Sequence, residues 1–224
     1  MHRTLLLCSA VIALASLMYA QAPPPPKAKP NPREVKLAGD RFKPLTYDQM
    51  TSAQKTMTEN ILYGERGSMA GPFNVMLRDP EMGDLAQKFG AYARFHAEVS
   101  PKLREMAIMI VMRHWTTQYE FRAHHQAALQ AGLNPAICDA IAQGKKPASM
   151  ADDEAGVYNF ATELLNTKQV SDATFQGAVK VLGGEKGVVD LMSLMGYYQM
   201  VAMMLNVDRY PLPEGAQPEL APLK

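Results

Sequence analysis

The sequence contains very little cysteine, which limits the chemistry that it can support. Only Cys8 and Cys138 occur in 224 residues, and Cys8 lies in an apolar N-terminal stretch. Loss of that stretch would leave Cys138 as the only thiol, so we expect no intramolecular disulfide even in an oxidising compartment. The sequence also lacks the CxxC and HExxH motifs of zinc sites, the GxSxG nucleophile elbow, the P-loop and the dinucleotide fingerprint. We therefore expect no metal and no cofactor.

Neither sign of charge is in excess. Lys and Arg number 23 and Asp and Glu number 22, which gives a formal net charge of +1. Nucleic-acid binding needs a clustered excess of basic side chains to neutralise phosphates, and the sequence suggests no such cluster. The 47% hydrophobic content is enough to bury a core in one domain or a small pair of domains. We expect a globular protein whose partner is a small molecule and not a nucleic acid.

The N-terminus has the pattern of a secretory signal peptide. Residues 1–20 place a basic residue ahead of a short apolar run, which ends in small residues before an abrupt change to a proline-rich composition. The run is too short for a membrane span. We expect cleavage after Ala20 or Ala22, a periplasmic or secreted protein, and no stable membrane anchor after cleavage.

Proline-rich segments flank the rest of the chain. Residues 21–44 are interpreted as a disordered tether, and residues 209–224 as a proline-rich tail with little periodicity. The folded domain is expected within residues 45–208, which is a usual size for a single domain.

Helix signals recur along this domain, while no stretch shows the alternating pattern of a strand. Ser100 and Pro101 can start a helix whose apolar positions are so numerous that we expect it to be central and buried. Asp79 and Pro80 can start another in the same way. The positions that follow at helical spacing there are Met82, Leu85, Phe89, Tyr92 and His96. The sequence predicts an all-α fold with a single compact domain of about seven or eight helices.

Glu120 and His124, in the stretch WTTQYEFRAHH, are the main candidates for chemistry. A separation of four residues places both side chains on one helix face and within reach of each other. A carboxylate can fix the tautomer of an imidazole and raise its basicity, so that the pair can exchange a proton near neutral pH. The alternative is a capping box, in which Thr117 and Glu120 satisfy backbone amides at a helix start. The spacing alone leaves both interpretations open.

Glu105 is a further candidate because of its surroundings. It lies in the apolar run REMAIMIVM, where a carboxylate would be costly to bury unless it were paired, for instance with Arg104, Arg113 or His124. The alternative is that Glu105 lies at the edge of the apolar face, or forms a structural ion pair. Both interpretations stay open at this point.

The stretch LREMAIMIVMRHWTTQYEFRAHHQAALQAGLNPAICDAIA resembles the carboxymuconolactone decarboxylase family, which includes the alkylhydroperoxidase D proteins. The resemblance covers residues 100–142 well and the flanks more loosely. The peroxidase branch of this family has a CxxC motif at the start of the second helix, and here Thr117 and Glu120 stand in place of its two cysteines. Because thiol peroxidation needs a thiolate and a resolving thiol, the resemblance points to the branch without cysteines.

That branch implies a cofactor-free decarboxylase that acts on a small carboxylated lactone or keto acid in an alkylhydroperoxidase D-like fold. Such an enzyme must stabilise an enolate-like charge and deliver a proton to carbon. By the resemblance, His124 is the expected acid, Glu120 orients it, and Glu105 is a supporting or proton-relay residue. The family also implies a homo-oligomer, a trimer or hexamer.

Five residues are expected to bind the substrate. Arg122 or Arg78 could anchor its carboxylate, and the others are Tyr119, Trp115 and Phe73. Two alternative functions remain open: a peroxidase of the alkylhydroperoxidase or peroxiredoxin type, which would have to use Cys138, and a non-catalytic binding or assembly module on the same scaffold.

Overall fold

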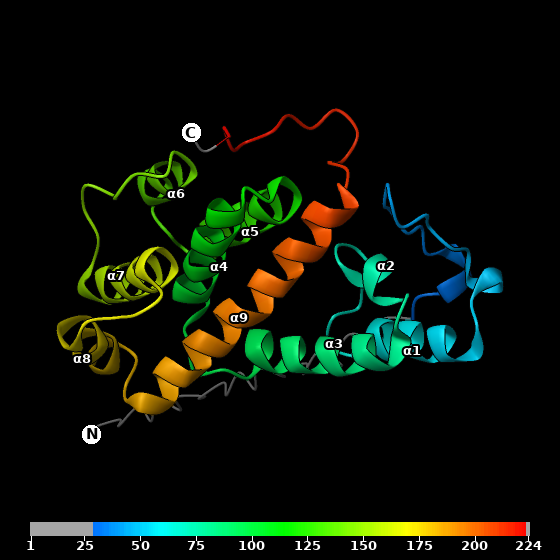
Figure 1. Ribbon diagram of the computed structural model, residues 1–224, viewed down its shortest axis with the longest axis horizontal. Coiled ribbons are helices and arrows are strands. Elements are labelled where there is room, and N and C mark those ends of the chain that lie inside the picture. The colour runs from blue at the N-terminus through cyan, green and yellow to red at the C-terminus, as the bar shows by residue number, and fades with distance from the viewer. Residues whose placement is uncertain (1–28, 223–224) are drawn as a thin grey trace, which may run out of the picture.

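The computed structural model describes residues 29–222, and all of the regular structure in this range is helical (Figure 1). The expected all-α fold is therefore confirmed. The described range contains nine α-helices, of which α2 has only four residues. The other eight agree with the seven or eight helices that the sequence predicts. The signal peptide expected at residues 1–20 lies outside the described residues.

The helices follow one another with short connections. In chain order they are α1 (Ser52–Tyr63), α2 (Phe73–Met76), α3 (Pro80–Phe95), α4 (Pro101–Trp115), α5 (Gln118–Gln130), α6 (Pro135–Ala142), α7 (Asp152–Thr167), α8 (Asp172–Val181) and α9 (Glu185–Asp208). Two short 3-10 helices, η1 (Pro32–Glu34) and η2 (Tyr47–Gln49), precede them.

Helix α4 is the central element, as expected. The side chain of Ser100 accepts a hydrogen bond from the amide of Leu103, and Pro101 occupies the first turn. Helices α5, α6, α7 and α9 all pack against α4. In Figure 1, α6, α7 and α8 lie to the left of α4 and α5, and α9 crosses the middle of the molecule. A helix that is apolar on every side has to be enclosed in this way.

A single residue, Thr116, ends α4. Its backbone is left-handed, with a φ of 51°, and its amide donates to carbonyl groups of the last turn of α4. After Thr117 the chain enters α5, which makes its most extensive contacts with α4. This tight connection brings the middle of α4 against the buried face of α5.

The apolar stripe from which α3 is predicted lies on the exposed side of the helix. Leu85, Phe89 and Tyr92 are largely exposed, whereas the buried side of the helix carries Gly83, Gln87, Gly90 and Ala93. The reason is close packing. A Cβ atom at Gly90 would lie 2.1 Å from the ring of Tyr197 in α9. Small residues therefore mark the inner face of α3, because they let the neighbouring helices approach.

Helix α9 contributes to the core along most of its length. By length and composition alone it could cross a membrane, but 56% of its most apolar window is buried inside the molecule. Core helices of water-soluble proteins pass the same test. Together with α4 and α7 it builds the larger of two hydrophobic clusters, and residues of α1 and α2 build the smaller one.

Both proline-rich flanks contact the domain where the structure describes them. The amides of Asp40 and Phe42 donate to the side chain of Asp208 at the end of α9. After α9, the chain returns across α5, and Leu220 is buried in the larger cluster. Residues 29–44 and 209–222 therefore belong to the folded unit, which is larger than the expected 45–208.

Candidate functional site

Two carboxylates enclose one imidazole between α4 and α5. Nδ1 of His124 lies 2.5 Å from Oε2 of Glu105, and Nε2 of His124 lies 3.2 Å from Oε2 of Glu120. Glu105 comes from the middle of α4, and the other two come from one face of α5. The three side chains that the sequence proposes for chemistry are thus in direct contact, and we call them the acid–histidine trio.

The trio is enclosed. The side chain of His124 is 3% exposed, that of Glu105 is 5% exposed and that of Glu120 is 10% exposed. The ring of Tyr198 in α9 meets the imidazole edge to face, with centroids 4.9 Å apart. Because this environment contains little water, the charges of the trio interact strongly with one another.

The pKa values of His124 and Glu105 both shift toward the charged forms. Burial alone would lower the pKa of His124, but the hydrogen bonds and negative charges of Glu105 and Glu120 raise it overall. Burial alone would raise the pKa of Glu105, but the hydrogen bond and charge of His124 lower it, with help from Arg94 and Arg104. Since both ring nitrogens face carboxylates, the trio is best described as an imidazolium that donates to each of them.

The capping-box interpretation of Glu120 is wrong. Thr117 precedes α5, but its side chain makes no capping hydrogen bond and instead donates to the side-chain oxygen of Asn206 in α9, at 3.1 Å. Glu120 turns toward His124 and not back to the backbone of Thr117. The carboxylate is therefore committed to the trio.

Gly71 covers the second oxygen of Glu120. Its φ is 84°, and a Cβ atom built on it would lie 2.8 Å from Oε1 of Glu120. Its amide donates to the hydroxyl of Tyr210 at 3.1 Å, and the ring of Tyr210 packs against that of Tyr119. A glycine is suited to this position for two reasons, because the backbone is left-handed and because no side chain fits above the carboxylate.

Arg94 in α3 was missed by the sequence analysis. Burial alone would lower the pKa of its guanidinium, but the charges of Tyr198, Glu105 and Glu120 raise it overall. Within the described residues, 29–222, Arg94 forms no ion pair and no hydrogen bond. Arg94 is four residues after Gly90 and therefore lies beside the small residues of α3. That face of small residues was the feature of the sequence that could have identified Arg94.

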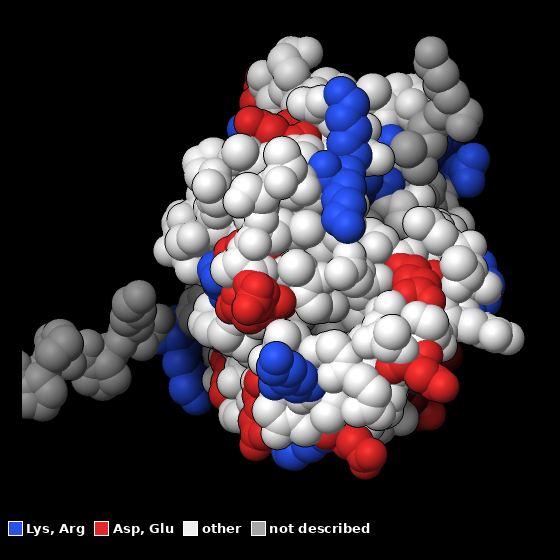
Figure 2. All heavy atoms as spheres, turned by 90° about the vertical axis from the view of Figure 1, so that its left-hand side faces the viewer, with Lys and Arg blue, Asp and Glu red and all other residues white. Residues whose placement is uncertain are grey.

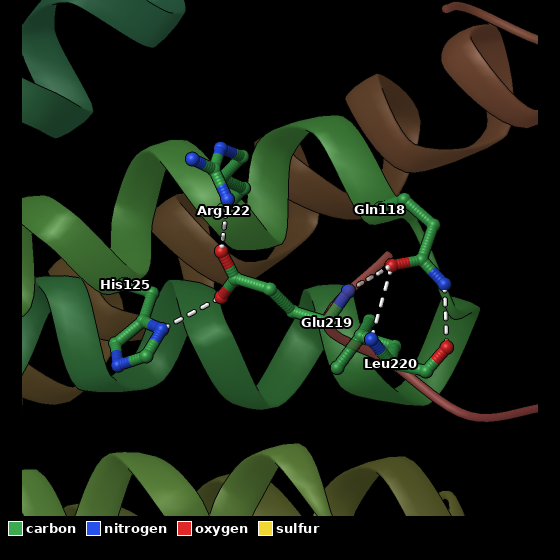
Figure 3. A network of polar contacts seen from close by, with 5 residues as sticks. All are labelled: Gln118, Arg122, His125, Glu219 and Leu220. Carbon is green, nitrogen blue, oxygen red and sulfur yellow. Dashed lines mark hydrogen bonds and ion pairs between the residues drawn. The ribbon is translucent and has the colours of Figure 1, made fainter. Parts of the chain in front are cut away.

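Neither of the two arginines expected to anchor a substrate lies at the trio. Arg122 pairs with Glu219 at 2.9 Å, and the same carboxylate accepts from Nδ1 of His125 at 2.7 Å (Figure 3). The side chain of Gln118 donates to the carbonyl of Leu220 and accepts from two backbone amides of the tail. Arg122 therefore anchors the C-terminal segment of the same chain.

Arg78 is exposed and donates to the carbonyl of Lys43 in the N-terminal segment. Phe73 is buried in the smaller cluster, beneath the guanidinium of Arg66. Trp115 contacts the ring of His114, and its carbonyl accepts from Asn206. Of the five expected substrate-binding residues, Tyr119 is the one that lies beside the trio, next to Glu120 in sequence and close to Gly71.

A cavity of about 250 Å³ lies between the start of α5 and the end of α9. Its walls include Thr117, Tyr119, Asn206 and Tyr210. The trio does not line this cavity. Tyr119 and Tyr210 line it and also adjoin Gly71, which covers Glu120. These two rings therefore stand between the cavity and the trio.

The donor groups of the trio bond to one another and do not converge on a common point. Within the described part of the chain, no group of three or more His, Cys, Asp or Glu side chains is arranged to hold a metal ion. No protein-family model matches the chain, and no curated protein matches it either.

Cys138 is poorly suited to thiol chemistry. It is fully buried in α6, and burial raises the pKa of its thiol to about 11, with a contribution from Asp139. At neutral pH such a group is a protonated thiol, whereas peroxide reduction requires an accessible thiolate. The environment of Cys138 therefore argues against the peroxidase alternative.

Proposed function

We propose that the protein is an exported, cofactor-free enzyme of the carboxymuconolactone decarboxylase type, which acts on a small carboxylated lactone or keto acid by proton transfer. The observation that carries this proposal is the buried acid–histidine trio. Natural cores seldom enclose two carboxylates and an imidazole, because desolvating charged groups is costly. Perturbed pKa values and close polar contacts of this kind are typical of functional sites.

The geometry favours a division of roles within the trio. Glu105 makes the shorter of the two contacts with His124. It binds Nδ1 and so fixes the orientation of the ring. Glu120, on the longer contact, is the most exposed member and adjoins Gly71 and Tyr119. We therefore assign the transfer of the proton to the substrate to Glu120, and its resupply to Nε2 of His124.

The reaction would proceed by loss of carbon dioxide and protonation of carbon. Cleavage of the bond to the carboxylate carbon releases carbon dioxide and leaves the electron pair delocalised onto the conjugated carbonyl as an enolate. The imidazolium of His124 first passes its Nε2 proton to the carboxylate of Glu120, and the resulting carboxylic acid donates that proton to the carbanionic carbon. Solvent resupplies the imidazolium. Arg94, whose positive charge interacts with the charges of both carboxylates, would stabilise the enolate oxygen.

The test is release of carbon dioxide from a panel of carboxylated lactones and keto acids. With a substrate of this class, replacing Glu120 with Gln is expected to reduce kcat by at least about 100-fold, because general acid catalysis contributes about 10²–10⁴-fold. The matched control is Glu214→Gln, which removes an exposed carboxylate from the tail. Equal activity of the two variants would remove Glu120 from the mechanism. Absence of turnover with every member of the panel would favour the non-catalytic binding module.

We also propose that the functional unit is a homo-oligomer, a trimer or hexamer. Leu85 of α3 is 71% exposed, and Val189 and Val207 of α9 are 53% and 52% exposed. Apolar side chains of this size, arranged along two helices, are typical of a surface that meets a second copy. A mass from light scattering that corresponds to three or six chains is expected. Leu85→Lys should reduce that mass, whereas a single-chain mass for the unaltered protein would contradict the proposal.

A further inference from the structure

A further cavity lies away from the trio, between α4, the loop after α6, and α7. Its volume is about 420 Å³. Ile110, Ile141 and Leu165 form an apolar part of its wall. This volume falls within the range of small-molecule sites, which are typically apolar with a few well-placed polar groups.

The polar part of the wall carries positive charge only. Arg113, Lys145 and Lys146 line the cavity together with His114, whose pKa is lowered by burial and by the charge of Lys168, and no Asp or Glu is among its lining residues. The other polar groups there are neutral, as in Asn159. Figure 2 shows this side of the molecule, with basic side chains gathered in the upper middle of the view and most of the acidic ones below them. Cations collected without a nearby acid repel one another, and an anion in the cavity would relieve that repulsion.

Arg113 is the buried member of this group. It is 6% exposed, and its Nη1 donates to the carbonyl of Ala221 at 2.7 Å. Its Nε is buried and has no hydrogen-bond partner among the described residues. A buried guanidinium with an unused donor is costly for the fold, and such groups normally have a partner. Arg113 thus adds a buried positive charge to the wall of the cavity.

The lysines reach the rim of the cavity because of the way α6 ends. Gly144, with a φ of 67°, closes the helix, and the amide of Lys145 donates to the carbonyl of Ala140. This left-handed closure turns the chain so that Lys145 and Lys146 stand at the opening. Both are exposed, and the carbonyl of Lys145 accepts from the hydroxyl of Tyr158 at 3.4 Å. The ammonium of Lys145 donates to the side-chain oxygen of Gln143 at 2.9 Å, an exposed contact that a ligand can replace.

We propose that this cavity binds a small organic dianion, such as a phosphate monoester, with its charged end near Arg113, Lys145 and Lys146 and its apolar end against Ile110, Ile141 and Leu165. Two negative charges match the three permanent cations better than one. None of these residues belongs to the acid–histidine trio, so the inference is independent of the proposed function. The cavity is a second site.

Calorimetric titration with phenyl phosphate at low ionic strength tests the inference. Phenyl phosphate is expected to bind at least about tenfold more tightly than inorganic phosphate, because the ring covers apolar wall. The double replacement Lys145→Gln and Lys146→Gln is expected to weaken the binding of phenyl phosphate by about tenfold or more. Added salt should also weaken the binding of phenyl phosphate, because it screens the charges. Because both lysines are exposed, this variant should fold normally.

The matched control is Lys180→Gln, which removes an exposed positive charge from α8, outside the cavity. It should bind phenyl phosphate as the unaltered protein does. The inference is overturned if the double variant binds as tightly as the control, if benzylamine binds as tightly as phenyl phosphate, or if phenyl phosphate does not bind to the unaltered protein at millimolar concentration.

Discussion

Replacing His124 with alanine is expected to lower the free energy of unfolding by about 3–5 kcal/mol, the usual cost of removing one partner of a buried ion pair. The variant leaves Glu105 and Glu120 enclosed without the imidazolium that both of them contact. Urea unfolding at pH 6 measures the effect as a decrease in the midpoint at an unchanged slope. Loss of turnover should accompany it, because the proton supply of Glu120 is removed.

His96→Ala is the matched control. His96 pairs with Glu65 on the surface at 2.8 Å, and both side chains are about half exposed. Water and salt screen such pairs, so its removal should change stability little. If the two histidine variants unfolded at the same urea concentration, the buried imidazolium described above would not exist.

The stability difference between the unaltered protein and His124→Ala should depend on pH in a defined way. The pKa of His124 is raised in the folded state, so its contribution is complete below the unfolded value of 6.5 and is lost as the pH rises through the folded value. The pKa of Glu105 is lowered, so its contribution is present above the unfolded value of 4.5 and is lost as the pH falls through the folded value. The difference in the free energy of unfolding should therefore be largest between pH 4.5 and pH 6.5, and it should narrow as the pH rises above 6.5 and through the folded pKa of His124.

Replacing Leu220 with alanine is expected to have the second-largest effect, a loss of about 1.5–3 kcal/mol. The side chain is 3% exposed and packs in the larger hydrophobic cluster, although it lies in a segment whose composition predicts a loose tail. Thermal unfolding gives the magnitude. Limited proteolysis should show faster cleavage within residues 209–222 of the variant.

The control for this prediction is Leu212→Ala, in the same segment but only half-buried. It should be cut at the rate of the unaltered protein. If Leu220→Ala were as stable and as resistant to protease as this control, the segment after α9 would contribute nothing to the fold.

The sequence predicts the helical fold and the members of the trio for local reasons. The spacing of Glu120 and His124 places them on one face, and the apolar neighbours of Glu105 indicate its burial. The partner of Arg122 could not be predicted in this way, because Glu219 lies 97 residues away and no periodic pattern connects the two. Arg94 was missed because the most apolar stripe of α3 faces outward, opposite to what hydrophobic periodicity alone indicates.

The adjacent histidines of α5 divide two tasks across one helical step of about 100°. His124 faces the two acids of the trio, and His125 faces Glu219 of the returning chain. Since His124 and His125 are adjacent in α5, this one helix both aligns the trio and attaches the C-terminal segment. A rotation or local unwinding of α5 would release both at once, so the C-terminal segment and the trio are coupled through this helix.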